Sequence, residues 1–244
     1  MRKERLDKLL VERGLAESRE KARALIMAGE VYVDGRRIDK AGTKISPESR
    51  IEIRGKGLPF VSRGGLKLSH ALQEFCLDVS GLVCADIGAS TGGFTDCLLQ
   101  AGAARVYAID VGRGQLHQKL RKDPRVIVME GINARYLRPE DLPELVDLVT
   151  IDVSFISLTK ILPAAKNILK SKGYIVALIK PQFEVGPRQV GKGGVVKDPR
   201  LHEEVKYKIK GFALKEGFEI LGLCESPILG PAGNKEFFIL LRKP

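Results

Sequence analysis

Four ionisable residues of the sequence have the side-chain types and positions suited to proton transfer. They are Lys67 in SRGGLKLSH, Asp152 in TIDVSF, Lys180 in LIKPQFE and Glu236 in GNKEFF. Asp152 and Lys180 each follow an apolar run typical of a central strand, so both are expected to point toward one ligand crevice. A lysine after the run YIVALI is unusual for a structural position, although an ammonium group reaching solvent from a strand end is the alternative.

A glycine-rich stretch, DIGASTGGFTD from Asp86 to Asp96, has the character of a cofactor-binding turn. A nucleoside-triphosphate loop needs lysine after its second glycine, and here Phe94 follows Gly93. A dinucleotide fingerprint needs G-x-G-x-x-G, and here Ser90 replaces the second glycine. Both kinds of nucleotide site are therefore disfavoured, although tight turns also use glycine for conformational reasons alone.

Acidic residues at two strand ends favour S-adenosylmethionine as the cofactor. Asp86 would repel phosphate, whereas it suits an amino group or the ordering of the turn around a cationic sulfonium. Asp110 ends the next strand, 22 residues after Gly88, and is placed to accept hydrogen bonds from both ribose hydroxyls of an adenosine. Asn133 suits either adenine binding or helix capping. The predicted cofactor-binding residues are Asp86, Gly88, Ser90, Gly92, Gly93, Phe94, Asp110 and Asn133.

The elements that must position these residues alternate from Leu82 onward. Apolar runs such as LVCADIG, RVYAIDVG, RVIVMEG, VDLVTIDVSF and YIVALI are separated by helical patterns, which include the stretch from Gly93 to Gly102 and LTKILPAAKNILK. This alternation predicts a parallel sheet with helices on both faces. The last runs, FEILGLCESPI and KEFFILLRK, are expected to form an antiparallel edge. The predicted fold class is α/β, with a doubly wound, Rossmann-like sheet.

The N-terminal segment predicts a separate, smaller α+β domain. Apolar residues at helical spacing end at Gly14, and Ser18 is the expected N-cap of a second helix. The run EVYVDGRRI then predicts a hairpin that turns at Asp34-Gly35. A glycine-rich stretch near residues 55 to 62 predicts a linker, so we place the two domains at 1–58 and 59–244.

Basic residues are concentrated in this first domain. The chain carries 41 Lys and Arg against 30 Asp and Glu, a formal net charge of +11 that suits a polyanionic partner. The segment RLDKLL…GLAESREKARALIMAGEVYVDG resembles the RNA-binding domain first described in a small-subunit ribosomal protein, over about residues 4–54. The resemblance implies structured RNA as the partner. The predicted RNA-binding residues of this domain are Arg5, Arg19, Lys21, Arg23, Arg36 and Arg37.

A second basic segment follows Lys180. Residues 184–199, EVGPRQVGKGGVVKDP, form a loop without helical or strand periodicity, and loops of this length are usually functional or disordered. We expect its Arg188, Lys192 and Lys197 to contact RNA phosphates and the loop to become ordered when RNA binds.

Composition excludes several other classes of protein. The sequence has neither the roughly 18 consecutive apolar residues of a membrane span nor a signal-peptide block, so we expect a cytoplasmic protein without a membrane partner. The cysteines and histidines lack the spacing of metal ligands, and no metal is expected. The four cysteines are interpreted as reduced, mostly core residues.

Taken together, the motifs resemble a known enzyme family. The second domain is similar to the FtsJ-type ribose methyltransferases, and nearly the whole chain resembles the TlyA family, whose members carry a historical haemolysin label and methylate ribose 2′-oxygens of ribosomal RNA. The resemblance implies a Lys-Asp-Lys-Glu tetrad at Lys67, Asp152, Lys180 and Glu236. It also implies ribosomal RNA or a ribosomal subunit as partner, with a cytidine of the large subunit as target and the small subunit as a further substrate of some members.

The chemistry of this family requires such a tetrad. A ribose hydroxyl is a weak nucleophile and must lose its proton while it attacks the methyl carbon. A lysine can accept that proton when burial and a second cation lower its pKa, so Lys180 is the expected base and Lys67 the second cation. Asp152 and Glu236 are expected to orient the two ammonium groups, although as anions they oppose this effect.

Other functions are less consistent with the sequence. Methyltransferases that act on exocyclic amines carry an N/D-P-P-Y/F motif where this chain has DVSF, and C5-cytosine enzymes need a nucleophilic cysteine. A non-catalytic RNA-binding or ribosome-assembly factor would not need the complete tetrad. A haemolysin would be expected to show an apolar span or a broad amphipathic basic helix. The oligomeric state is open, with a monomer favoured.

Overall fold

The computed structural model describes residues 3–27, 29–53, 59–230 and 232–244. The chain divides into two compact units, Met1–Arg63 and Gly64–Pro244. The expected linker lies partly outside the described residues, because 54–58 are among those not described. Within the described ranges, no helix is both long and apolar enough to cross a membrane.

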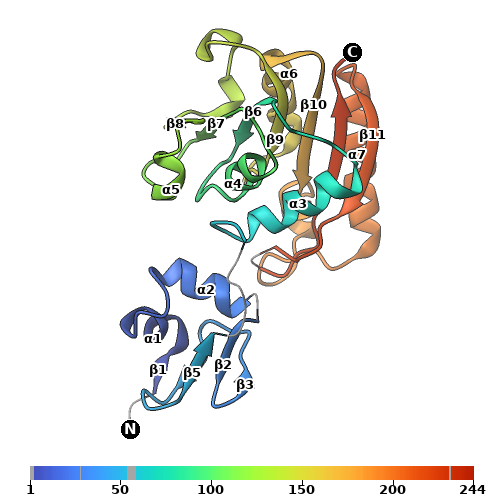
Figure 1. The fold of residues 1–244 in the computed structure, drawn as a ribbon. Helices are drawn as coiled ribbons and strands as arrows, with labels where there is room; N and C mark the ends of the chain where they lie inside the picture. Colours follow the sequence, from blue (N-terminus) through green and yellow to red (C-terminus); the bar gives the residue numbers. More distant parts are fainter. Residues whose placement is uncertain (1–2, 28, 54–58, 231) are drawn as a thin grey trace. The chain divides into compact units, whose positions relative to one another are not determined.

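The first unit contains the two expected helices, together with a three-stranded sheet in the order β3-β2-β5 and a separate two-stranded pairing of β1 with β4 (Figure 1). Its hairpin turns at Asp34 and Gly35, both with positive φ, as a tight turn between twisted strands requires. Its core is formed by apolar residues of both helices and of the sheet. The elements are β1 (Glu4–Arg5), α1 (Leu6–Glu12), α2 (Arg19–Met27), β2 (Val31–Val33), β3 (Arg36–Arg37), β4 (Lys44–Ile45) and β5 (Ile51–Ile53).

The second unit is built on a seven-stranded sheet in the order β11-β12-β10-β9-β6-β7-β8. Neighbouring strands pair in parallel along the series β10, β9, β6, β7 and β8. Strand β12 pairs antiparallel with both β10 and β11. The α/β fold with an antiparallel edge is therefore confirmed. The strands are β6 (Val83–Ile87), β7 (Arg105–Asp110), β8 (Val126–Glu130), β9 (Val146–Ile151), β10 (Leu169–Ile179), β11 (Glu219–Glu225) and β12 (Phe237–Arg242).

Helices cover both faces of this sheet (Figure 1). One face carries α3 and α4, and the other carries α6 and α7, whose apolar residues pack on the inward side chains of the strands. The helices are α3 (Gly64–Glu74), α4 (Gly93–Gln100), α5 (Gln118–Arg121), α6 (Leu162–Ile168) and α7 (Pro199–Lys215).

The structure differs from the expected elements in one boundary and one helix. The helical pattern of LTKILPAAKNILK ends at Ile168, because Leu169 is fully buried and pairs with Val146 as the first residue of β10. The longest helix, α7, was not anticipated from the sequence, because charged residues interrupt its apolar stripe. Its inward residues are His202, Val205, Ile209 and Ala213.

Candidate active site

The predicted reactive residues lie at one end of the large sheet, where the parallel strands have their carboxyl ends. Asp152 directly follows β9, and Lys180 directly follows β10. Because β12 is antiparallel, its first residue Phe237 pairs with Ile179 at the same edge, which places Glu236 there as well. The alternation of side chains along strands then directs these residues to the face that α3 covers. Lys67 lies on α3, so the fold brings all four predicted residues to one corner of the sheet.

The four residues form two ion pairs. The Lys180 Nζ atom lies 2.5 Å from Asp152 Oδ1 and also donates to Ser154 Oγ at 3.0 Å. The Lys67 Nζ atom lies 2.6 Å from Glu236 Oε2. The first pair is partly accessible, whereas Lys67 is only 6% exposed and Glu236 only 1% exposed. The two lysine side chains themselves differ little, at 11% exposed for Lys180 and 7% for Lys67, and the larger difference is between Asp152 at 21% and Glu236 at 0%.

Glu236 has a second carboxylate oxygen with a special environment. Its Oε1 atom is buried and has no hydrogen-bond partner among the described residues. A Cβ atom placed on Gly230 would lie 2.3 Å from this oxygen, so glycine is the residue that leaves room for the carboxylate. A buried acceptor without a donor is costly, and such groups are often found at functional sites.

The glycine-rich turn follows β6 and directly contacts the end of β9. Gly88 has φ +86°, and a Cβ atom there would lie 2.4 Å from the Asp152 backbone oxygen. Gly92 also has positive φ and precedes α4, where a Cβ atom would meet the side chains of Leu116 and Leu120. The two glycines therefore allow a close turn that a side chain would block, and this turn adjoins the Lys180–Asp152 pair.

Asp86 lies beneath the turn and is fully buried. Its carboxylate accepts hydrogen bonds from Thr95 Oγ1 at 2.7 Å and Thr150 Oγ1 at 3.0 Å. Of the two roles considered for Asp86, ordering of the turn fits this position, and direct contact with an amino group does not. Desolvation raises the pKa of Asp86 to about 7, and the hydrogen bonds from the two threonines oppose this rise.

We therefore predict a measurable pH dependence of stability from Asp86. The folded chain holds the Asp86 proton up to about pH 7, whereas the unfolded chain releases it near the ordinary value of 3.8. The free energy of unfolding should thus fall as pH rises between these values, by up to roughly 1.4 kcal/mol per pH unit. Denaturant unfolding of wild type and Asp86→Asn at pH 5, 6, 7 and 8 tests this, because the other titrations cancel in the difference. A difference that does not vary with pH would refute it.

Asp110 and Ser90 connect the ends of β7 and β6. The Asp110 carboxylate accepts hydrogen bonds from the Ser90 backbone N–H and the Gly112 backbone N–H, both at 2.7 Å. Ser90 has φ +49°, a conformation that is uncommon outside glycine. Each carboxylate oxygen retains further acceptor capacity, so the predicted contact with ribose hydroxyls is compatible with this arrangement.

Two other residues predicted to bind cofactor have structural roles. The Phe94 side chain is buried, and its ring centroid lies 6.1 Å from that of Phe238, so it packs in the core and its predicted contact with cofactor is not supported. Asn133 Oδ1 accepts a hydrogen bond from the Arg135 backbone N–H at 3.1 Å and caps a 3₁₀ turn. Capping, one of the two roles considered for Asn133, is therefore present.

The basic loop after Lys180 has more structure than its sequence indicates. It contains a 3₁₀ turn at Pro187–Gln189, and its later part is anchored by hydrogen bonds between Asn234 and the backbone of Gly194 and Val196. The predicted phosphate contacts Arg188, Lys192 and Lys197 are all exposed. Their availability to RNA is consistent with the prediction, and the expected ordering on RNA binding stays a prediction.

The arginines predicted to bind RNA in the first unit have mixed environments. Arg5, Arg19 and Arg23 form ion pairs with Asp7 and remain about half exposed. Arg36 and Arg37 are exposed on β3, and Lys21 is partly exposed.

Several residues near this corner of the sheet were missed by sequence reasoning. Ser154 binds Lys180, and its position two residues after Asp152 is the signal that was available. Phe155 is 91% exposed with φ +63°, and its ring centroid lies 5.0 Å from that of Phe183. Glu184 is buried and binds Ser157 Oγ and the Leu158 backbone N–H, which holds the segment after β9 in place.

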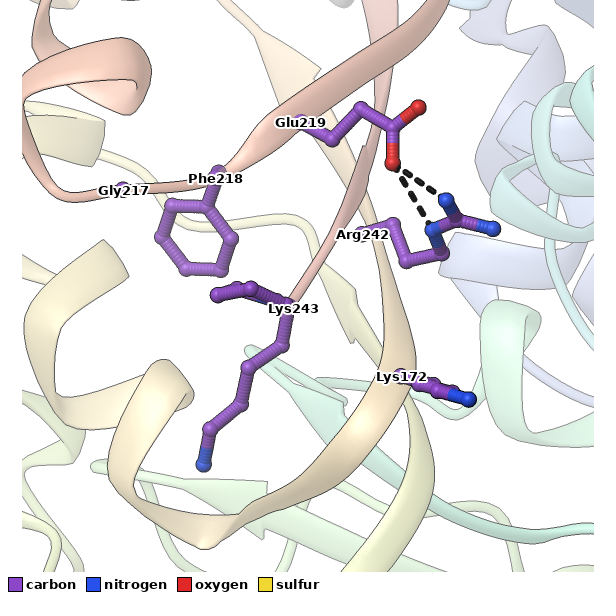
Figure 2. A pocket seen from close by; sticks show the side chains of 7 residues that line it. Lys172, Gly217, Phe218, Glu219, Arg242 and Lys243 are labelled. Atoms are coloured by element: carbon purple, nitrogen blue, oxygen red, sulfur yellow. Dashed lines mark hydrogen bonds and ion pairs between the residues drawn. The ribbon is translucent and has the colours of Figure 1, made fainter.

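A cavity of about 560 Å³ lies at the opposite end of the strands and is not part of this site (Figure 2). It lies beside the first residues of β11 and the last residues of β12. Two of its charged residues have partners within the protein, because Arg242 pairs with Glu219 and Lys243 donates to the backbone oxygens of Lys166 and Leu169. The predicted reactive residues lie at the other end of the strands, where the ion pairs and the glycine turn meet.

Comparisons with known proteins identify the families to which the two units are similar. Residues 60–243 match the family model of the FtsJ-like methyltransferase, and residues 4–51 match the S4 domain. The chain is 48% identical over 242 residues to the Mycobacterium tuberculosis 16S/23S rRNA (cytidine-2′-O)-methyltransferase TlyA, covering 99% of this chain and 90% of that protein.

Two solved structures are also similar to this chain. A Streptococcus thermophilus protein that carries the hemolysin name is 50% identical, with a TM-score of 0.79 over 100% of this chain and 89% of that one. The N-methyltransferase NodS from Bradyrhizobium japonicum, solved with S-adenosyl-L-homocysteine, shares the fold at 14% identity, with a TM-score of 0.53 over 75% of this chain and 88% of that one. With an S4 domain before its catalytic unit and S-adenosylmethionine as methyl donor, the chain belongs to the FtsJ-like methyltransferase family, within the TlyA group.

Proposed function

We propose that this enzyme methylates the ribose 2′-oxygen of a cytidine in ribosomal RNA, with the large subunit as its principal substrate and the small subunit as a further one. One observation carries the proposal most directly. The Gly88 turn touches the Asp152 backbone, and the Asp152 carboxylate holds Lys180. A methyl donor bound at this turn would therefore lie beside a lysine that can accept a proton.

The residues present fit S-adenosylmethionine. Gly88 and Gly92 let the turn pack closely against the Asp152 backbone and the side chains of Leu116 and Leu120, and Asp110 presents a carboxylate beside it. S-adenosylmethionine, when bound, supplies the methyl group and leaves as S-adenosylhomocysteine. Gly88, Ser90, Gly92, Gly93 and Asp110 would hold it, and Asp86 would keep the turn in shape from below.

The protein's own contribution to the reaction is to bind, orient and deprotonate the ribose. Neutral Lys180 would accept the proton of the 2′-hydroxyl as the oxygen forms its new bond to carbon. Asp152 and Ser154 would hold the Lys180 amine toward the hydroxyl, since Asp152 forms an ion pair with Nζ and Ser154 Oγ accepts a hydrogen bond from it. Lys67 and Glu236 would form a buried wall of the site and supply fixed charges beside the reacting groups.

An exposed aromatic ring favours a nucleotide substrate. Phe155 follows Asp152 by three residues, and Phe183 follows Lys180 by three, so the two rings in contact lie beside the proposed base. Exposed aromatic rings stack on unpaired nucleobases, and base–aromatic stacking contributes about 1–3 kcal/mol per base. We propose that Phe155 stacks on the target base or its neighbour and holds the ribose at Lys180.

Phe155→Ala should therefore lower kcat/KM for ribosomal RNA by about ten- to a hundredfold, the equivalent of one lost stacking contact. Binding of S-adenosylmethionine should not change, because the ring lies outside the glycine turn. Tyr207→Ala is the matched control, since Tyr207 is also highly exposed but lies on α7. Steady-state methyl transfer measures both variants, and equal kcat/KM in Phe155→Ala and Tyr207→Ala would remove Phe155 from the proposal.

The charge distribution supports RNA as the partner. The S4 domain and the exposed Arg188, Lys192 and Lys197 provide basic surface on both units. Salt should weaken binding, because each neutralised phosphate releases counterions. We further propose that the enzyme acts as a monomer in the cytoplasm, where its ribosomal substrate is found.

Transfer of labelled methyl groups to ribosomal subunits that lack the modification tests the function. A 2′-O-methyl group prevents alkaline cleavage at its own phosphodiester bond, so the product should be an alkali-resistant dinucleotide. Large and small subunits are assayed in parallel, which separates the two proposed substrates. Label on a base, or binding of both substrates without transfer, would overturn the proposal and favour a non-catalytic assembly factor.

A further inference from the structure

The first unit contains a buried carboxylate that contacts three arginines. Asp7 is 0% exposed, although it stands in the first turn of α1. Its Oδ1 atom accepts from Arg5 Nε at 2.9 Å. Its Oδ2 atom accepts from Arg5, Arg19 and Arg23 at 3.0, 3.1 and 3.2 Å. We call Arg5, Arg19 and Arg23 the arginine cluster.

The arginine cluster is assembled from separate elements. Arg5 belongs to β1, whereas Arg19 and Arg23 lie one turn apart on α2. Three guanidinium groups this close together would repel one another without an anion between them. The arginines hold the pKa of Asp7 well below its ordinary value, so the carboxylate stays ionised. The three arginines and Asp7 together therefore carry a net charge of +2.

The cluster differs from an ordinary buried ion pair because its cations remain accessible. The side chains of Arg5, Arg19 and Arg23 are 45%, 54% and 49% exposed. Each guanidinium has five N–H donors in a fixed plane, and Asp7 uses two from Arg5 and one each from Arg19 and Arg23. Because these side chains are about half exposed, their remaining donors are accessible to a ligand, and guanidinium groups bind phosphate oxygens in a bidentate manner.

We propose that Asp7 is a positioning residue that fixes Arg5, Arg19 and Arg23 as one preorganised site for the phosphodiester backbone of RNA. This inference rests on the proposed ribosomal RNA substrate. Asp7 itself is inaccessible and does not touch RNA, so its effect on affinity is transmitted by the orientation of the arginines. Without Asp7 the three side chains would keep their charge and lose their common geometry.

The proposal and simple electrostatics predict effects of opposite sign for Asp7→Asn. Removing a negative charge from a basic surface should strengthen RNA binding if only net charge matters. Loss of positioning should weaken it instead, by about tenfold for a set of charge-assisted contacts. Filter binding of the full chain to in-vitro-transcribed ribosomal RNA between 50 and 200 mM salt measures the affinity and its salt slope.

A mutant cycle separates positioning from folding. Arg19→Ala should weaken RNA binding in the wild-type background and have much less effect in the Asp7→Asn background. Lys21→Ala is the control, since Lys21 lies two residues from Arg19 and therefore on another face of α2. Its effect should be equal in both backgrounds. Equal effects of Arg19→Ala in both backgrounds would refute the proposal.

Two further variants cover the case in which Asp7→Asn does not fold. Arg19→Lys and Arg23→Lys keep the charge and remove the planar fork, so the proposal predicts weaker RNA binding with an intact circular dichroism spectrum. Unchanged affinity in folded Arg→Lys variants would overturn it. If the wild-type chain itself does not bind ribosomal RNA, the proposed function fails, which is a different result from binding that is insensitive to Asp7.

Discussion

Replacing Lys180 with methionine is expected to lower kcat for methyl transfer by about 10²- to 10⁴-fold, the usual contribution of a positioned general base. Methionine keeps much of the side-chain length and cannot accept the proton of the 2′-hydroxyl. Affinity for S-adenosylmethionine should be nearly unchanged, because the glycine turn is held by Asp86 and Asp110, not by Lys180. Single-turnover kinetics with ribosomal subunits and calorimetry with the cofactor measure the two quantities.

Two controls test whether the effect is that of a base. Lys180→Arg keeps the positive charge beside Asp152, but a guanidinium does not release its proton in proteins, so this variant should be as slow as Lys180→Met. Lys170→Met makes the same change at the start of β10, the strand that Lys180 follows, and there Lys170 pairs with Asp147 at 2.8 Å at the opposite end of the strands. It should leave kcat unchanged. Activity in Lys180→Arg comparable to wild type would show that Lys180 acts by charge and not by proton transfer.

The position of the Lys180–Asp152 pair could be predicted from the sequence, because the place of each residue follows from the strand directly before it. Asp152 and Lys180 each follow a buried strand, and the carboxyl ends of parallel strands share an edge. Alternation along the strands then directs Asp86, Asp152 and Lys180 to one face of the sheet. The pairing of Lys67 with Glu236 was not predictable in this way, because it depends on how α3 packs on β12, 169 residues apart in the sequence.

The different roles of the acidic residues could be assigned only from the structure. Asp86 and Asp110 both end strands, and only the three-dimensional contacts show that Asp86 is buried beneath two threonines whereas Asp110 binds the turn itself. Similarly, a helical pattern shows that Arg19 and Arg23 share a face, but it does not show that Asp7 joins them to Arg5. Contacts between distant segments are set by packing, which periodicity does not encode.

The Lys67–Glu236 pair has the largest expected effect on stability. Lys67→Met should lower the free energy of unfolding of the catalytic unit by about 3–5 kcal/mol, because it leaves a buried carboxylate without its cation. Lys235→Met is the matched control. Lys235 is the neighbour of Glu236, and its ion pair with Glu225 is about half exposed on both sides, so its loss should change stability by less than about 1 kcal/mol.

A double variant then separates stability from function at the same site. Lys67→Met combined with Glu236→Leu replaces a buried ion pair with apolar side chains, and such replacements are often neutral or stabilising. Denaturant unfolding should therefore show recovery of most of the stability lost in Lys67→Met. Methyl transfer should stay low in the double variant, because the buried charges that border the Lys180 site would be gone. If activity recovered together with stability, Lys67 and Glu236 would be structural residues, and the reaction would depend on Lys180 and Asp152 alone.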